Sequence, residues 1–351
     1  MIERVSIQNF RCFPSLQVSG LRRINVIVGR NSSGKTAFLE SLFLSSGAAA
    51  PNVVFQFRAL RHLGNQIQIA GDAASYQSLW DDLFHWFNQD NTISIEISGT
   101  QGDSRSLRAF YSAASSQLLP LGKQPIGASV PPQIVFEWRR GSNEPITVRP
   151  VITGTGLIIE GASLDHFPLI LFSPNSPDSP EEHAKRFSEL SKKNESGQVT
   201  EGLKSEFPFL TSLEIEYYSG IPAVHASISG YERKIPVALL SDGINKLMGI
   251  LLGIATYKNG LILIDQIEDG FYYDRLESIW RLIYRFATDN NVQLFVTTHS
   301  QDCLRALLPT LRGHTDDFCL LRAQREDGHS TVTQVPGKFF EAALESGAEL
   351  R

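Results

Sequence analysis

Residues 29–36 read GRNSSGKT, and this stretch decides the fold class of the chain. It fits the phosphate-loop pattern GxxxxGK[ST], which chance would produce in roughly one chain in a hundred of this length. The apolar run INVIV precedes it at 24–28, and the helical pattern TAFLESLFL follows at 36–44. Between a strand and a helix, backbone N–H groups and the helix N-terminus can surround a phosphate. The stretch therefore predicts a nucleotide site on an α/β fold.

Two side chains of this loop have distinct expected roles. Lys35 would bridge the β- and γ-phosphates of ATP, and the Thr36 hydroxyl would ligate Mg²⁺. The implied cofactors are ATP and Mg²⁺. The residues that we assign to the nucleotide within the loop are Gly29, Asn31, Ser32, Ser33, Gly34, Lys35 and Thr36.

A second polar group follows the buried-strand pattern LILI at residues 261–264. Asp265 ends this strand and is the predicted acid on the Mg²⁺ side, opposite Thr36. The next residue is Gln266, where many ATP-hydrolysing sites carry a carboxylate that polarises the attacking water. Glutamine has the shape of glutamate but cannot accept a proton at neutral pH. Hydrolysis is therefore expected to be slowed, since a positioned base is worth about 10²–10⁴ in rate.

Three explanations for Gln266 remain open. The amide is an engineered substitution that traps the ATP state, or the protein is a naturally slow ATPase used as a switch. Alternatively Glu268, on the same strand face by period-two alternation, supplies the base.

The motif LFVTTHS, residues 294–300, ends a third apolar strand at His299. One helical segment, residues 273–289, separates it from the strand that ends in Asp265. A histidine at this place fits a sensor of the γ-phosphate. Gln266, Glu268 and His299 are thus the candidate catalytic residues.

The segment LLSDGIN, residues 239–245, stands directly before a helical pattern. Ser241, Asp242 and Gly243 would form a second anion-binding helix N-terminus, which we call the signature segment. One chain does not need two such N-termini for one triphosphate, but two facing copies would use both. The sequence therefore predicts a homodimer, or a higher homo-oligomer, with ATP sandwiched between phosphate loop and signature segment.

The bulk composition is that of an ordinary globular protein, with 351 residues, 42% hydrophobic and 20% charged. The net charge of −5 does not indicate DNA or an anionic membrane as a partner, although a local basic patch would allow DNA binding. Three cysteines without metal spacing suit a reducing cytosol. The first residues are no signal peptide, and the longest apolar run is too short to cross a bilayer. We therefore expect a cytoplasmic protein.

The remaining patterns predict how the chain is organised. Alternating runs between residues 92 and 152 predict an antiparallel β subdomain. The aromatic-rich residues 76–89 are predicted to form a helix packed by its Trp and Phe side chains. Residues 180–207 predict a charged helix pair, too short for a long coiled-coil arm. Alternation of helices and buried strands from residue 244 onward predicts a parallel sheet flanked by helices.

The motif order GxxxxGKT, LSxG, IDxIExG and TTHS resembles the ABC-type ATPases of the SMC and OLD-like group. The spelling is similar to their short branch without a coiled coil, the AAA-family (OLD-like) ATPases of bacterial anti-phage and toxin-type operons. The stretches that match include IQNFRCF, IPVALLSDGINKL, LILIDQIEDGFYY and ALESGAELR. The family has an LSGGQ-like element where this chain has LSDGI, and glutamate where it has Gln266.

The resemblance implies an ABC-type ATPase head with a parallel core sheet, an antiparallel β subdomain and a helical lobe. It also implies that Arg11 lies near the base or ribose, and that Asp269 lies in a loop that acts across the dimer. The expected division of the single module is lobe I at 1–50 and 255–351, a β-rich insertion at 51–170, and a helical lobe at 171–254.

In the branch that the chain resembles, such an ATPase controls a separate effector, a Toprim-like nuclease or a toxin, in phage defence. We find no C-terminal stretch with the acidic pattern of a Toprim nuclease, so nuclease activity is expected on a partner. The alternative is a RecF-type ATPase of DNA repair, which would not be expected to carry IDxIExG or TTHS. A small-molecule kinase would leave LSDG and TTHS without a role.

Overall fold

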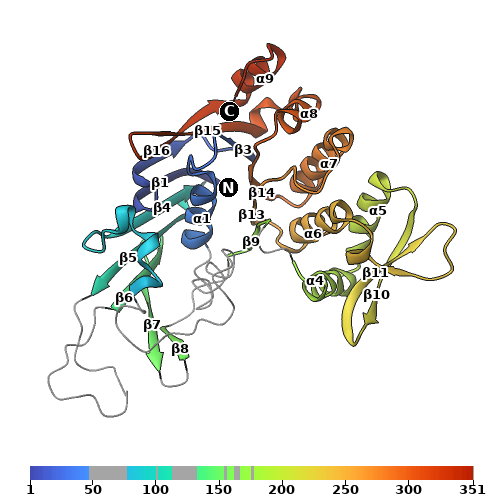
Figure 1. Ribbon diagram of the computed structural model, residues 1–351, viewed down its shortest axis with the longest axis horizontal. Helices are drawn as coiled ribbons and strands as arrows, with labels where there is room; N and C mark the ends of the chain where they lie inside the picture. The colour runs from blue at the N-terminus through green and yellow to red at the C-terminus, as the bar shows by residue number, and fades with distance from the viewer. Residues whose placement is uncertain are drawn as a thin grey trace.

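The computed structural model describes residues 1–46, 77–99, 102–112, 133–153, 156–161, 167–174 and 178–350. Figure 1 shows two halves that meet at a central sheet, one built mainly from strands and one built mainly from helices. Much of the insertion expected at 51–170 lies outside the described residues.

The strand-rich half is an antiparallel sheet with the order β2-β1-β4-β5-β6-β7-β8. Alternation sets its two faces, since Val5, Ile7 and Ile95 are buried while Gln8 and Glu96 are exposed. The antiparallel β subdomain expected between residues 92 and 152 is confirmed. The strands are β1 (Ile2–Phe10), β2 (Phe13–Ser19), β4 (Ile93–Gly99), β5 (Ser104–Ser112), β6 (Gln133–Arg140), β7 (Ile146–Thr153) and β8 (Gly156–Gly161).

The central sheet has six strands in the order β16-β15-β3-β14-β13-β9. All neighbouring pairs except β16 with β15 are parallel, which confirms the expected parallel sheet. Three of its four inner strands, β3, β13 and β14, read INVIV, LILI and QLFVT and are buried along their whole length. Such runs form where both faces of a parallel sheet are covered. The strands are β3 (Ile24–Val28), β9 (Leu169–Phe172), β13 (Leu261–Ile264), β14 (Gln293–Thr297), β15 (Phe318–Glu326) and β16 (His329–Pro336).

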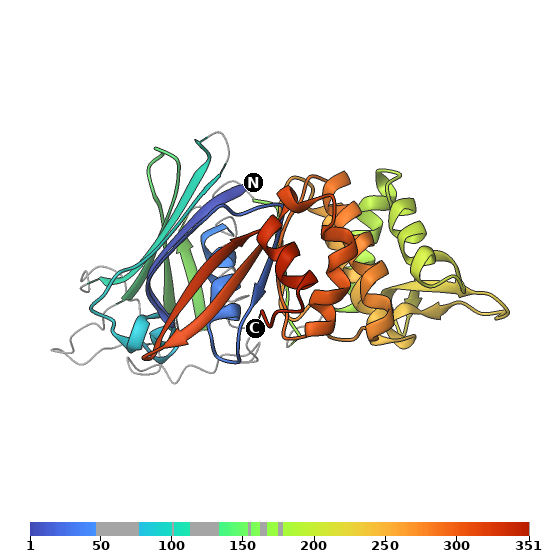
Figure 2. The same cartoon turned by 90° about the horizontal axis from the view of Figure 1, so that it is seen from above.

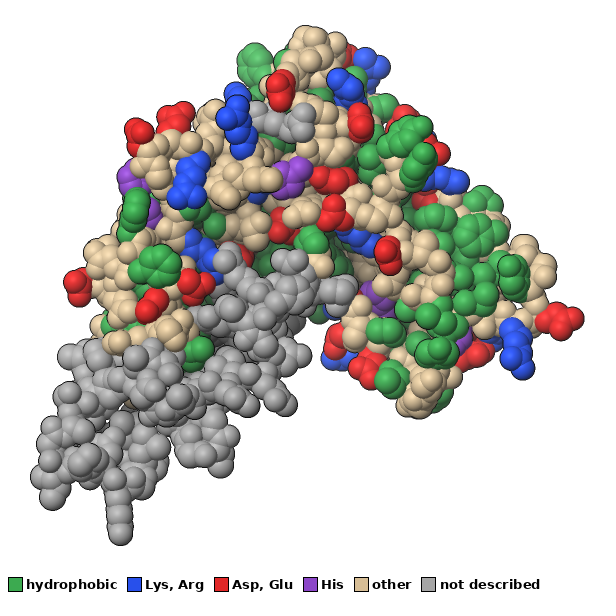
Figure 3. Space-filling view, in the orientation of Figure 1, with side chains coloured by type: hydrophobic (Ala, Val, Ile, Leu, Met, Phe, Trp, Pro, Cys, Tyr) green, Lys and Arg blue, Asp and Glu red, His purple; other side chains and the backbone are tan. Residues whose placement is uncertain are grey.

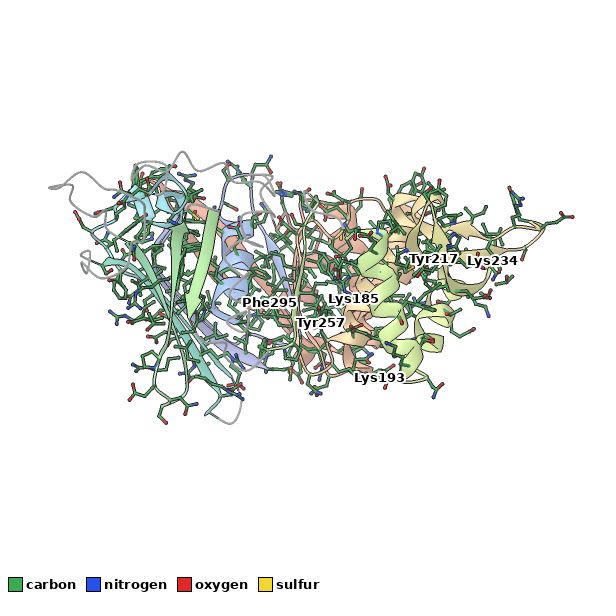
Figure 4. All side chains as sticks on the ribbon, turned by 90° about the horizontal axis from the view of Figure 1, so that it is seen from below. Lys185, Lys193, Tyr217, Lys234, Tyr257 and Phe295 are labelled. Carbon is green, nitrogen blue, oxygen red and sulfur yellow. The ribbon has the colours of Figure 1, made fainter. Side chains whose placement is uncertain are left out.

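Helix α1 (Lys35–Ser46) fills the space between the two sheets. Phe38 of α1 packs against Phe295 of β14, with ring centroids 6.3 Å apart, and Figure 4 shows Phe295 between helix and sheet. The indole of Trp138 donates a hydrogen bond to the carbonyl of Leu44 at 2.9 Å, which ties the end of α1 to β6. The helix that follows the phosphate loop is therefore fixed from both sides.

The other face of the central sheet is covered by helices (Figures 1 and 2). Strands β10 and β11 form a hairpin in this half, and Figure 4 labels Tyr217 of β10 and Lys234, which lies between β11 and β12. The charged helix pair expected at 180–207 is confirmed, and no helix in the described ranges is long and apolar enough to cross a membrane. The elements are α4 (Pro180–Lys192), α5 (Ser196–Glu206), β10 (Leu210–Tyr218), β11 (Ile221–Ile228), β12 (Ile235–Pro236), α6 (Asp242–Thr256), α7 (Leu276–Asp289), α8 (Gln301–Leu311) and α9 (Gly337–Glu345).

The helix expected at 76–89 is wrong. From Asp81 the chain forms two 3-10 turns, η1 (Asp81–Leu83) and η2 (His85–Phe87). Trp86 and Phe87 have φ of 55° and 57°, a left-handed conformation that bulky residues rarely adopt and that no α-helix continues. Their side chains are 66% and 68% exposed, so the aromatic residues of this segment do not share one buried face.

Candidate nucleotide site

The phosphate loop joins the end of β3 to the start of α1, and its two motif glycines have backbones that other residues would strain. Gly29 has φ of 146°, and a Cβ there would lie 2.1 Å from the carbonyl oxygen of Ala323. Gly34 has φ of 103°, and its Cβ would lie 2.9 Å from Sγ of Cys12. The glycine spacing of the motif is therefore required by the close passage of β15 and of the turn after β1.

The loop presents hydrogen-bond donors at the N-terminus of α1. The first four N–H groups of a helix have no acceptor within it, and α1 begins at Lys35. Asn31 and Ser32 are exposed, whereas the Ser33 hydroxyl is buried and accepts or donates no hydrogen bond. Ser32 has φ of 61°, so the loop turns back on itself just before the helix. This arrangement suits an anion such as a phosphate.

Lys35 is buried, and its Nζ donates to the carbonyl oxygens of Gly29 at 2.8 Å and Arg30 at 2.9 Å. Burial lowers the pKa of Lys35 to about 8, and the carboxylates of Asp265 and Glu268 oppose this shift. The ammonium is thus held by its own loop, near two acids that follow β13. A phosphate beside it would favour the charged form.

Thr36 and Asp265 are 229 residues apart in sequence, and their side chains meet, with Oγ1 of Thr36 donating to Oδ2 of Asp265 at 3.0 Å. The other oxygen of Asp265 accepts from the Thr297 hydroxyl. A hydroxyl and a carboxylate are hard oxygen ligands of the kind that hold Mg²⁺ together with phosphates and water. Among the described residues, no group of three or more His, Cys, Asp or Glu is placed to hold a metal ion.

The residues after β13 form a turn. Gln266 has φ of 54°, and its N–H donates to the Thr297 hydroxyl at 2.8 Å. The backbone N–H of Ile267 then donates a hydrogen bond to the carbonyl oxygen of Thr297 at 3.0 Å, and the Ile267 side chain is buried in the core. Strand alternation predicts that Glu268 lies on the same strand face as Gln266. This expectation is wrong, because β13 ends at Ile264 and the left-handed backbone of Gln266 changes the direction of the chain.

Glu268 nevertheless lies at the site, beside His299. The backbone N–H of His299 donates to Oε1 of Glu268 at 2.7 Å, while Oε2 is buried without a hydrogen-bond partner. Burial, and then the charge of Lys35, lowers the pKa of His299, so its ring is neutral at neutral pH. The structure thus brings Lys35, Asp265, Glu268 and His299 together, and Figure 3 shows acidic side chains near the middle of this face beside basic and histidine ones.

The signature segment begins α6, on the opposite face of the central sheet from α1 (Figure 1). Ser241 is the N-cap, and its Oγ accepts from the N–H of Ile244 at 3.3 Å. A Cβ at Gly243 would lie 2.6 Å from the carbonyl oxygen of Gly270, so the helix start lies against the turn that follows Asp269. Asp242 and Asp269 are exposed. The start of α6 is thus exposed to solvent at Ser241 and Asp242, and its contact with a nucleotide of a second copy stays a prediction.

Lys246 is a site residue that the sequence reasoning missed. Its Nζ donates to the carbonyl oxygens of Gln266 at 2.7 Å and Asp269 at 2.9 Å, and it lies 5.5 Å from the ring centre of Phe271. Burial lowers its pKa, against the raising effect of Asp269. The signal that could have found it is its spacing, three residues after Gly243 and so on the same helix face. Lys246 links the signature helix to the turn that carries Gln266.

We expect Lys246→Met to lower the free energy of unfolding by about 2 kcal/mol, because two carbonyl oxygens lose a charged donor. Lys258→Met is the matched control, since Lys258 makes a partly exposed ion pair with Glu195 at 2.7 Å, a kind worth about 0–1 kcal/mol. Urea unfolding of both variants checks the difference. Equal losses would mean that the contacts of Lys246 do not stabilise the turn.

Arg11, expected near the base or ribose, is buried in ion pairs. Its guanidinium lies 3.3 Å from Glu40 of α1 and 3.3 Å from Asp82 of η1. Through Glu40, one turn after Thr36, it braces the helix of the phosphate loop. Its contact with the nucleotide stays a prediction, as does the role of Asp269 across a dimer.

This site and fold define an ATPase of the ABC type, in which a phosphate loop, a strand ending in an acid and a strand ending in histidine share a parallel sheet. A family model described as "AAA domain, putative AbiEii toxin, Type IV TA system" matches residues 24–304, and the chain belongs to this family. It is also similar to an ATP/GTP phosphatase of Helicobacter pylori, with 22% identity over 91% of this chain and 92% of that protein.

Solved structures with a similar fold include SMC heads, which confirms the expected ABC-type head. One is an SMC head bound to the C-winged helix domain of ScpA, with a TM-score of 0.54 and 14% identity, covering 95% of this chain and 97% of that one. Another is the Smc head domain with an extended coiled coil from Pyrococcus furiosus, bound to the C-terminal domain of ScpA. It has a TM-score of 0.53 and 12% identity and covers 98% of each chain.

Proposed function

We propose that the protein binds ATP with Mg²⁺, closes as a homodimer around it, and controls a separate effector in bacterial anti-phage defence. In this proposal it is a cytoplasmic, OLD-like ATPase, and the effector is a Toprim-like nuclease or a toxin. The observation that carries the ATPase role is the 3.0 Å contact of Thr36 with Asp265. It joins the residue after the phosphate-loop lysine to the acid that ends β13, the pair that a triphosphate with Mg²⁺ requires.

The geometry supports a division of labour in hydrolysis. Water attacks the γ-phosphorus while the bond to the β–γ bridging oxygen breaks, and ADP leaves with that electron pair. Lys35 stabilises the charge on the phosphate oxygens, and His299 orients the γ-phosphate through its neutral ring. Mg²⁺ held by Thr36 and Asp265 would neutralise further phosphate charge.

The placement of the signature segment supports the dimer. Its capped helix N-terminus and the phosphate loop lie on opposite faces of the central sheet, so one chain does not close them on one nucleotide. A second copy turned to face the first would place each signature segment on the other copy's phosphate loop.

The proposal of a separate effector protein is supported by the SMC heads whose fold the chain shares. The two similar SMC heads were each bound to a domain of ScpA, so heads of this fold can carry partner proteins. The RecF alternative has weaker support, since a RecF protein of Desulforudis audaxviator matches 36% of this chain and 28% of its own length, at 28% identity.

The product of the adjacent gene is the partner to test. We expect the two purified proteins to form a complex whose nuclease or toxic activity changes when ATP–Mg²⁺ is added. A neighbourhood of replication and repair genes, together with ATP-dependent binding of gapped DNA, would instead favour the RecF-type role.

Gln266→Glu should raise ATP turnover at least tenfold, because a carboxylate at this position can take the proton that the amide cannot. Phosphate release under saturating ATP–Mg²⁺ checks this. Gln266→Asn is the control, since it keeps the amide and should bring no gain. An unchanged rate in Gln266→Glu would show that Gln266 is not the cause of slow hydrolysis.

A further inference from the structure

We propose that Glu268 is the catalytic residue that takes the proton of the attacking water in this chain, in place of Gln266. This inference rests on the proposed ATPase function and names the base of its hydrolytic step. Its starting point is the unusual state of one carboxylate oxygen beside the phosphate loop.

The two oxygens of Glu268 have different surroundings. Oε1 accepts a hydrogen bond from the backbone N–H of His299 at 2.7 Å, which fixes the direction of the carboxylate. Oε2 is buried and accepts no hydrogen bond. A buried acceptor without a donor costs free energy, and a water molecule that donates to it removes this cost. The site therefore favours a water at Oε2.

The other acids of the site are less suited to this role. Both oxygens of Asp265 are engaged by the hydroxyls of Thr36 and Thr297, and the same carboxylate is the predicted Mg²⁺ ligand. Asp269 is exposed on the far side of the turn, next to the start of α6. In the part of the chain that the structure describes, Glu268 is the one acid with a buried oxygen that has no hydrogen-bond partner.

The turn is built to present Glu268. Gln266 adopts φ of 54°, at a cost that a non-glycine residue meets only when its surroundings impose it. The surroundings here are Lys246, which holds the carbonyl oxygen of Gln266, and the Thr297 hydroxyl, which holds its N–H. Ile267 is buried on one side of the turn, so Glu268 faces His299 on the other.

The charges around Glu268 fit an acceptor near the γ-phosphate. Its carboxylate acts electrostatically on Lys35, on Lys246 and on His299, so it lies among the groups that would surround the reacting phosphate. In the step, the water oxygen bonds to the γ-phosphorus and one water proton passes to Oε2 of Glu268. The bond to the bridging oxygen breaks with its electron pair on ADP, and phosphate and ADP are the products.

The test is a double-mutant cycle between positions 266 and 268. Glu268→Gln keeps a carbonyl oxygen for the N–H of His299 but removes the proton acceptor, and we expect turnover to fall at least about a hundredfold. Adding Gln266→Glu to that variant should restore turnover at least tenfold, because it supplies a second acceptor. Single-turnover phosphate release, with ATP affinity measured in parallel, gives both numbers, and the restored variant also shows that the fold is intact.

Three results would contradict either the role of Glu268 as the base or the ATPase function itself. Turnover unchanged in Glu268→Gln excludes Glu268 as the base. An equal fall in Glu268→Gln and in the doubly substituted chain, without restoration, shows a structural role only. If the unaltered protein turns over no more ATP than Lys35→Met, the proposed ATPase function fails before the question of the base arises.

Discussion

Lys35→Met should lower ATP turnover by about 10²–10³-fold, the loss typical when one preorganised donor to the developing charge is removed. Methionine has nearly the length of lysine and fills its buried position, so the change removes the charge and leaves the packing. The ammonium now donates to the carbonyl oxygens of Gly29 and Arg30, at the start of the loop that would surround the phosphates. Phosphate release and nucleotide affinity, measured on one preparation, check this result.

Lys193→Met is the matched control for this prediction. Lys193 follows α4 on the helical half, is exposed, and lies far from α1 in Figure 4. We expect its turnover to equal that of the unaltered protein. Equal turnover in Lys35→Met and Lys193→Met would contradict the assignment of the phosphate loop as the ATP site.

Ser241→Trp should abolish an increase in mass that ATP–Mg²⁺ brings about in the unaltered protein. Ser241 is exposed at the start of α6, where a second copy would place its phosphate loop, and an indole would occupy the space of the nucleotide. Sedimentation with and without ATP–Mg²⁺ measures the mass of the assembly. Both proteins keep Gln266, which should slow hydrolysis and so keep ATP bound during the measurement. A mass increase that persists in Ser241→Trp contradicts the sandwich.

Ser241→Ala separates the interface from the helix cap. It loses the hydrogen bond that Oγ accepts from the N–H of Ile244, which typically stabilises a protein by about 1 kcal/mol, but it adds no bulk. We expect this variant to unfold at lower urea concentration and still to dimerise with ATP. Loss of the dimer in both variants would point to the cap or hydroxyl itself.

Local patterns were enough to predict most of the fold. The runs INVIV, LILI and QLFVT are mostly apolar and carry no charged residue, a pattern typical of strands in a parallel sheet that is covered on both faces. The glycines of the phosphate loop predicted its conformation, because Gly29 and Gly34 adopt backbone angles that other residues would strain. At residues 76–89 this reasoning failed, because apolar spacing cannot show that Trp86 and Phe87 adopt left-handed backbones and point to solvent.

The chemistry of the site was predictable only where motif and geometry coincide. Thr36 and Asp265 meet as expected because the phosphate loop that follows β3 and the acid that follows β13 lie at the same edge of one parallel sheet, with β14 between the two strands. The direction of Glu268 could not be inferred, since it follows from the backbone of Gln266 and from contacts with Lys246 and Thr297. Ion pairs such as Arg11 with Glu40 depend on how a sheet and a helix pack, which no local pattern records.

The neighbours of β3 in the central sheet have a consequence for synthesis of the protein. The side chain of Asn25 in β3 donates to the carbonyl oxygen of Leu294 in β14, 269 residues later. Ribosomes add about 5–20 residues per second, so β3 waits on the order of 15–50 s for this neighbour, and longer for β15. Throughout that time both edges of β3 have no neighbouring strand, and other chains can pair with them. The nucleotide site can therefore form only after β14 and β15 have been synthesised, because these two strands flank β3 in the central sheet.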